Sequence, residues 1–283
     1  MLIEVKTLNN ISIKNVVLKV LDIESMQSFY EKTLGLTVLN QHEKSVVLGI
    51  DHIPLLTLKT SNRYEKPNQN YSGLYHMAFL LPEEAYLGQF IKHLVALKQP
   101  ITGLGDHLYS QAIYLNDPEG NGIEVYADRP RSSWIINNDG TIIGGTRAVD
   151  VEGLMRIAHP QAWSGMPDHT ILGHVHLQVS DIESARSFYL NRLGFELKTE
   201  MQKALFVSRE GYHHHIGINE WAGPNIADLP ENTSGMESFT ISTPSFVTYR
   251  EELIQAGEKI VDLDANHFEI IDPFHINIIF EKI

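Results

Sequence analysis

One pattern of apolar and polar positions occurs twice along the chain. Residues Val17–Leu36 read VLKVLDIESMQSFYEKTLGL, and residues His176–Phe195 read HLQVSDIESARSFYLNRLGF. In each copy an alternating apolar run predicts a strand, and D-I-E-S followed by S-F-Y predicts a helix. Asp22 and Asp181 stand where N-caps are expected, and a glycine follows the last turn of each helix. The repeat predicts copies of one supersecondary unit.

A fainter repeat extends this pattern. The stretches Gly73–Pro82 (GLYHMAFLLP) and Gly235–Pro244 (GMESFTISTP) each predict a strand followed by a helical stretch. Further along, an Asp-Pro pair at Asp117 matches one at Asp272. The chain therefore divides into four βαβββ modules, at about residues 13–60, 73–128, 172–220 and 235–283.

These modules predict an α+β fold with two tandem domains, residues 9–128 and residues 172–283. The connection between them, residues 129–171, contains proline, glycine and Trp134. A connection of this length rarely lacks structure of its own, so we expect it to pack on the surface or to carry a short helix.

The composition of the chain argues against some classes of function. The content of 43% hydrophobic and 20% charged residues is typical of a globular protein. The formal net charge of −13 argues against nucleic acid as a partner, because phosphate binding needs a basic surface. The N-terminus lacks the layout of a signal peptide, and no apolar run approaches about 18 residues. We therefore expect a cytoplasmic protein that does not bind membranes.

The chain contains no cysteine, which excludes disulfides, thiolate metal sites and cysteine nucleophiles. Histidine and carboxylate remain as the available metal ligands, and they suit Fe(II), Mn(II) or Zn(II).

The stretch GDHLYSQAIYLNDPEGNGIE places His107, Tyr114 and Glu124 close together in sequence. Two short strands joined by its D-P-E-G turn would form a hairpin with Tyr114 beside Glu124. An imidazole, a phenol and a carboxylate at the end of a small sheet are groups that metal-dependent oxygen chemistry uses.

This stretch, read as G-x-H-x5-I-Y-x2-D-P-x-G-x3-E, resembles the signature of the type I extradiol ring-cleavage dioxygenases. The four modules resemble the vicinal oxygen chelate superfamily, which also includes glyoxalases and fosfomycin-resistance enzymes. GLYHMAFLLP and GIEVYADRPR are similar to stretches of the two-domain catechol 2,3-dioxygenases. The resemblance implies cup-shaped mixed β-sheets, in which two modules surround one metal and the first and last strands carry its ligands.

The ligand positions that the resemblance implies are incomplete in either half of the chain. They are Asn15, His76, His174 and Ser238 on the first strands, with Glu124 and Ile279 on the last strands. Pairing the two middle modules gives His76, Glu124 and His174, a 2-His-1-carboxylate set of the kind that non-haem Fe(II) oxygenases use. We therefore expect ligands from both halves to meet across a domain interface.

Two alternatives compete with this ligand set. His176 would share a strand face with His174, but G-H-x-x-L-x-V-x-D matches the superfamily pattern at His174. Glu124 could instead form a buried ion pair with Arg129 or Arg131, since an unpaired buried carboxylate is costly.

The resemblance also implies an acid–base histidine in the stretch YHHHIGI. Aligning this stretch with the family's strand selects His214, with His213 or His215 as alternatives. The other interpretation is a group of histidines that is purely structural or binds a metal adventitiously. By the same resemblance, His107 and Tyr114 would hydrogen-bond substrate and intermediate oxygens.

Other aromatic residues are expected to be structural. Tyr75 should point to the strand face opposite His76. Phe79, Phe206 and Trp221 are expected in the core, with an aromatic pocket as the alternative.

The function that the resemblance implies is Fe(II)-dependent extradiol cleavage of a catechol-type ring, with Mn(II) as a possible replacement. A small aromatic diol and O2 would be the partners, and catechol would give 2-hydroxymuconic semialdehyde. The alternatives are a hydroquinone-type substrate, a glyoxalase-like lyase or isomerase with His214 as a fourth ligand, and a non-enzymatic small-molecule binding protein. A homo-oligomer is possible on general grounds.

Overall fold

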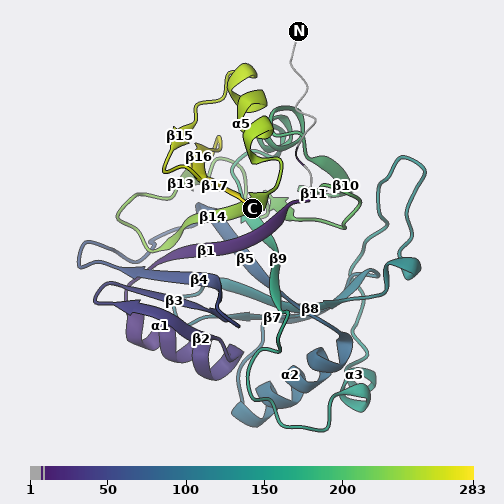
Figure 1. The fold of residues 1–283 in the computed structure, drawn as a ribbon. Coiled ribbons are helices and arrows are strands. Elements are labelled where there is room, and N and C mark those ends of the chain that lie inside the picture. The colour runs from purple at the N-terminus through teal and green to yellow at the C-terminus, as the bar shows by residue number, and fades with distance from the viewer. Residues whose placement is uncertain (1–7, 9) are drawn as a thin grey trace.

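The computed structural model describes residue 8 and residues 10–283. Within this part of the chain, each of the four predicted modules forms a strand, a helix and then further strands (Figure 1). The α+β class and the βαβββ pattern predicted from the sequence are confirmed.

The first half of the chain contains two such modules. Their elements are β1 (Ser12–Val20), α1 (Ile23–Phe29), the π-helical turn η1 (Tyr30–Leu34), β2 (Thr37–His42), β3 (Ser45–Ile50) and β4 (Ile53–Thr60), then β5 (Tyr71–Leu81), α2 (Glu84–Leu97), β6 (Gly103–Asp106), β7 (Ser110–Asn116) and β8 (Gly122–Asp128).

The second half repeats this order with an additional short strand between its two modules. Its elements are β9 (Ile171–Gln178), α4 (Ile182–Arg186), the π-helical turn η3 (Ser187–Arg192), β10 (Glu196–Met201), β11 (Ala204–Ser208) and β12 (Ile216–Asn219), then β13 (Ala227–Asp228), β14 (Gly235–Thr243), α5 (Phe246–Gln255), β15 (Val261–Asp262), β16 (His267–Ile271) and β17 (Asn277–Lys282).

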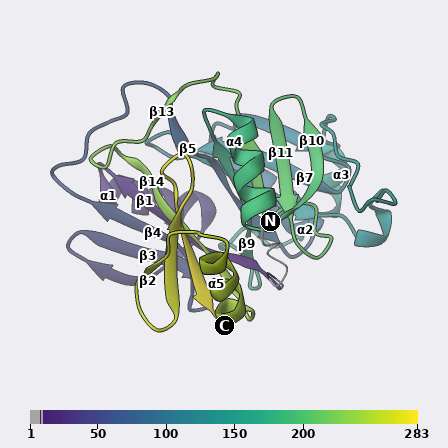
Figure 2. The same cartoon turned by 90° about the horizontal axis from the view of Figure 1, so that it is seen from above.

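The strands pair modules from opposite halves of the chain. β5 pairs antiparallel with β9, which gives the order β6-β7-β8-β5-β9-β12-β11-β10. β1 pairs antiparallel with β14, which gives the order β2-β3-β4-β1-β14-β17-β16-β15. Figure 2 shows the first and last modules, purple and yellow, beside the teal and green middle modules. We call the assembly built on β5 and β9 the middle cup, and the assembly built on β1 and β14 the outer cup.

A pairing of Ile13 with Leu172 joins β1 to β9, so the two cups form one sheet. Each cup takes one module from each half of the chain. The boundaries of two tandem domains, residues 9–128 and 172–283, remain a prediction.

The repeated helices begin as predicted. Asp22 accepts a hydrogen bond from the backbone N–H of Ser25 (3.0 Å), and Asp181 accepts from those of Glu183 (2.9 Å) and Ser184 (3.3 Å). These bonds satisfy donors that the first turn of a helix leaves free.

The Asp-Pro turns are held by the tyrosine of the S-F-Y repeat. Tyr30 donates to Asp117 (2.8 Å) in the first half, and Tyr189 donates to Asp272 (2.9 Å) in the second, with all four residues buried. Each aspartate also accepts two backbone N–H bonds within its own turn. The turn at Asp117 therefore supports the predicted hairpin of β7 and β8.

The central connection carries the 3-10 turn η2 (Arg131–Ser133) and the short helix α3 (Val151–Ile157). α3 packs against α2 where Gly88 allows close approach, since a Cβ there would lie 2.0 Å from the Leu154 carbonyl oxygen. No helix in the described part of the chain is long and apolar enough to cross a membrane.

The tyrosine–aspartate bonds predict a stability effect. Replacing Tyr30 or Tyr189 with phenylalanine removes a buried hydrogen bond to a carboxyl group. Each change should lower the free energy of unfolding by about 1–3 kcal/mol, measured by urea denaturation. Tyr71→Phe is the control, since its hydroxyl bonds to the exposed Asn68 and its loss should change stability by less than about 0.5 kcal/mol. Equal effects at all three positions would contradict this account.

Candidate metal centre

The register of three neighbouring strands brings the predicted ligands together. On β5, Ala78 is the register partner of Glu124 on β8 and of His174 on β9. Side chains two residues apart on a strand share a face, so His76 joins the same side. A small residue at the centre leaves room for the larger side chains to meet above it.

The ligand atoms of His76, Glu124 and His174 lie within 4.8 Å of one another, and all three residues are buried. Glu124 Oε2 is 3.0 Å from His76 Nε2 and 3.2 Å from His174 Nε2. The structure therefore gathers the three residues that the sequence predicted as ligands, although they come from both halves of the chain.

The protonation states of Glu124 and His174 suit the binding of a cation. Burial raises the pKa of Glu124, but the neighbouring His174 and His76 imidazoles outweigh it and hold that pKa well below its usual range. Burial lowers the pKa of His174 to about 4. A carboxylate and a neutral imidazole are the forms that bind metals. His76 Nε2 is buried without a well-oriented hydrogen-bond partner in the described structure, so the donor set fits a divalent metal ion.

The alternative of a Glu124–arginine pair is not observed in the described residues. Arg129 forms a bidentate pair with Asp106 (2.6 and 3.0 Å), and Arg131 donates to the carbonyl oxygens of Glu210 and Gly211. Neither guanidinium compensates the Glu124 charge.

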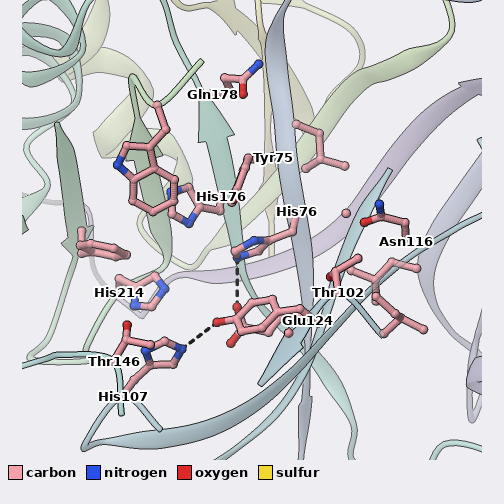
Figure 3. A pocket seen from close by; sticks show the side chains of 18 of the residues that line it. Tyr75, His76, Thr102, His107, Asn116, Glu124, Thr146, His176, Gln178 and His214 are labelled. Atoms are coloured by element: carbon pink, nitrogen blue, oxygen red, sulfur yellow. Dashed lines mark hydrogen bonds and ion pairs between the residues drawn. The ribbon is translucent and has the colours of Figure 1, made fainter. Parts of the chain in front are cut away.

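A cavity of about 630 Å³ opens beside this group. Figure 3 shows the rings of His76, His107 and His214 gathered around Glu124. The cavity wall combines these polar groups with aromatic and aliphatic side chains. Its lining includes Leu74, Tyr75, His107, Tyr114, Leu115, Ile123, Thr146, His176, Met201, Phe206, His214 and Trp221.

His107 and Tyr114 form one hydrogen-bonded unit. His107 Nε2 lies 2.7 Å from the Tyr114 hydroxyl, and His107 Nδ1 lies 2.8 Å from the Gly145 carbonyl oxygen. Because a carbonyl accepts only, Nδ1 donates to it, and a neutral ring then accepts from Tyr114 at Nε2. Burial and the nearby Glu124 charge raise the pKa of Tyr114 well above its usual value, so its phenol keeps its proton.

Of the three consecutive histidines, His214 lines the cavity. Its ring centroid is 4.1 Å from that of His174, and its Nε2 is buried without a hydrogen-bond partner in the described structure. His213 lies behind it and bonds to its Nδ1, whereas His215 bonds to Ser208 (2.7 Å).

The prediction for Tyr75 is wrong. It lines the cavity and packs edge-on against His176 (5.2 Å between ring centroids) and Trp221 (5.4 Å). The reason is an irregularity between Leu74 and His76 in the β5–β9 pairing, which breaks the strict alternation of faces.

Phe206 and Trp221 also line the cavity, while Phe79 is fully buried in the core. The central connection contributes Thr146 to the wall and the Gly145 carbonyl to His107. No sequence signal marked these two residues, because the connection has no repeated counterpart.

Comparison with known proteins agrees with this architecture. A family model described as the Glyoxalase/Bleomycin resistance protein/Dioxygenase superfamily matches residues 12–125 and 171–273. A Bacillus subtilis protein named catechol-2,3-dioxygenase is 38% identical over 270 residues, which is 90% of this chain and 92% of that protein.

Solved structures share the fold. A putative dioxygenase from Bacillus subtilis superposes with a TM-score of 0.64 at 11% identity, covering 96% of this chain and 84% of that one. Glyoxalase I from Zea mays superposes with a TM-score of 0.56 at 16% identity, covering 96% and 93%. The chain therefore belongs to the glyoxalase/bleomycin resistance protein/dioxygenase superfamily.

Proposed function

We propose that this protein is an extradiol ring-cleavage dioxygenase that uses Fe(II), with Mn(II) as the alternative metal, to open a catechol-type ring. The observation that carries the proposal is a cavity that lies beside the buried group of His76, Glu124 and His174 and is lined by His107, Tyr114 and His214. The 38% identity to a catechol-2,3-dioxygenase over most of both chains supports it.

His76, Glu124 and His174 would hold the metal. When bound, such a metal supplies the electron transfer that lets a diol and O2 react while they are held next to each other. Catechol would then give 2-hydroxymuconic semialdehyde, with both oxygen atoms of O2 in the product.

The remaining polar side chains handle protons and oxygen charge. His214 lines the cavity, its Nε2 has no hydrogen-bond partner in the described structure, and this nitrogen would take a proton from a diol hydroxyl. The hydrogen-bonded pair of His107 and Tyr114 would stabilise negative charge on substrate oxygen. Phe206 and Trp221 would limit the access of water.

The cavity wall also indicates the substrate class. Among the described residues that line the cavity there is no lysine or arginine, and the one acidic residue is Glu124. Its apolar wall residues include Leu74, Leu115 and Met201. A carboxylate on the ring would be buried without a cation to pair with, so we propose uncharged or alkyl-substituted catechols as substrates.

The activity is tested with anaerobically Fe(II)-loaded protein mixed with catechol in air. We expect stoichiometric O2 uptake and a yellow ring-opened product, because an extradiol semialdehyde is conjugated. Methylcatechols and hydroquinone are assayed in parallel, and the hemithioacetal of methylglyoxal with glutathione tests the glyoxalase alternative. No turnover of any diol, or turnover of the hemithioacetal alone, would overturn the proposal.

Substrate charge gives a second test. The kcat/KM for 3,4-dihydroxybenzoate should be at least about 100-fold below that for 4-methylcatechol, because the carboxylate meets no cation in the cavity. Comparable values for the two compounds would contradict the proposed substrate class.

The ligand set is tested by Mn(II) binding, followed by the electron paramagnetic resonance signal of the free ion. His174→Ala should weaken binding by more than about 100-fold, because it removes a ligand. His176→Ala is the matched control, since it lies two residues along the same strand but outside the ligand group, and should weaken binding less than about tenfold. Wild-type affinity in His174→Ala would redirect the assignment to His176.

A further inference from the structure

Two side chains, the buried His213 and the partly buried Asp128, continue the hydrogen bonding of His214 away from the cavity. His214 Nδ1 lies 2.7 Å from His213 Nδ1, and His213 Nε2 lies 2.9 Å from Asp128 Oδ1. The exposed fractions of His213 and His214 are 1% and 4%. This Asp128–His213–His214 chain ends at His214 Nε2, the unpartnered atom at the cavity wall.

Aromatic packing fixes the orientation of the middle ring. Tyr109 stacks on His213 with ring centroids 4.3 Å apart and planes 13° from parallel. Tyr212 and Trp134 also pack against it, at 4.1 and 5.3 Å. Because close-packed rings turn only if their neighbours move, the positions of the two His213 nitrogens are set by packing as well as by hydrogen bonds.

The hydrogen positions follow from what each partner can accept. The Asp128 carboxylate accepts only, so His213 Nε2 carries a hydrogen. A bare nitrogen there would face the carboxylate lone pairs at 2.9 Å, which is repulsive. The two Nδ1 atoms lie 2.7 Å apart, so one hydrogen fits between them. When His213 carries a single ring hydrogen, that hydrogen is on Nε2, and the hydrogen between the rings is carried by His214 Nδ1.

We infer that Asp128 and His213 are positioning residues that hold His214 in the tautomer with hydrogen on Nδ1 and a bare Nε2 facing the cavity. Neither Asp128 nor His213 lines the cavity, so both act through His214.

The catalytic meaning of this tautomer rests on the proposed function. When a diol hydroxyl gives its proton to His214, the O–H bond breaks, an Nε2–H bond forms, and the electron pair stays on oxygen. The resulting cationic ring donates from Nδ1 to His213, whose own Nε2–H is held by the Asp128 carboxylate. The negative charge of Asp128 thus stabilises the proton that His214 has taken.

The tautomer is measured on the metal-free, substrate-free protein labelled with ¹⁵N at histidine. Long-range ¹H–¹⁵N correlation spectra distinguish a protonated ring nitrogen from a bare one, and the signals lost in His214→Gln identify those of His214. We expect a protonated Nδ1 and a bare Nε2. A hydrogen on Nε2 in the wild-type protein would overturn the inference.

A variant tests the role of His213. His213→Phe keeps an aromatic ring against Tyr109 but removes the acceptor for His214 Nδ1, so His214 should shift mainly to the Nε2–H tautomer. His215→Phe is the control, because His215 bonds to Ser208 outside the chain of three residues, and it should leave the His214 signals unchanged. An unchanged tautomer in His213→Phe would refute the role of His213.

Activity separates this inference from the proposed function. In the Fe(II)-loaded protein, His213→Phe should lower kcat for catechol by about 10–100-fold while KM changes by less than about threefold. Wild-type protein that shows the expected tautomer but cleaves no diol would refute the proposed function alone. Ring cleavage by wild-type protein with hydrogen on Nε2 would refute the tautomer alone.

Discussion

The antiparallel pairing of β5 with β9 is the contact on which the site depends. It joins a strand from each half of the chain and sets Ala78 opposite His174, while β8 sets Glu124 on the other side of Ala78. A slip of one residue in this register would turn a whole strand's side chains to the other face. Backbone hydrogen bonds therefore determine which imidazoles meet the carboxylate.

The two cups share one architecture but differ in chemistry. In the outer cup, the positions that correspond to the proposed ligands hold Asn15, Ser238 and Ile279, and Asn15 accepts a hydrogen bond from Thr57 (3.3 Å). Neutral polar and apolar groups there need no cation. The same fold thus carries a candidate metal centre in one cup and ordinary packing in the other, so the side chains and not the fold indicate function.

Repetition explains what the sequence could predict. The modules, the helix caps at Asp22 and Asp181, and the grouping of the three proposed ligands follow from patterns that occur more than once or match a known family. Tyr75 could not be placed, because a local irregularity in strand pairing leaves no mark in the residue pattern. Thr146 and Asp128 were missed because their neighbours are distant in sequence and depend on how the halves assemble.

The division of the proposed ligands between the halves links metal affinity to the integrity of the sheet. Glu124 and His174 are 50 residues apart in sequence and meet where β5 separates their strands. An unfolded chain presents no such group, so a cation bound there would favour the folded state by mass action. Because one ion would contact both halves, it would serve as a non-covalent cross-link between them. Metal binding and the folding of the middle cup would then be coupled, so that a change in one would change the other.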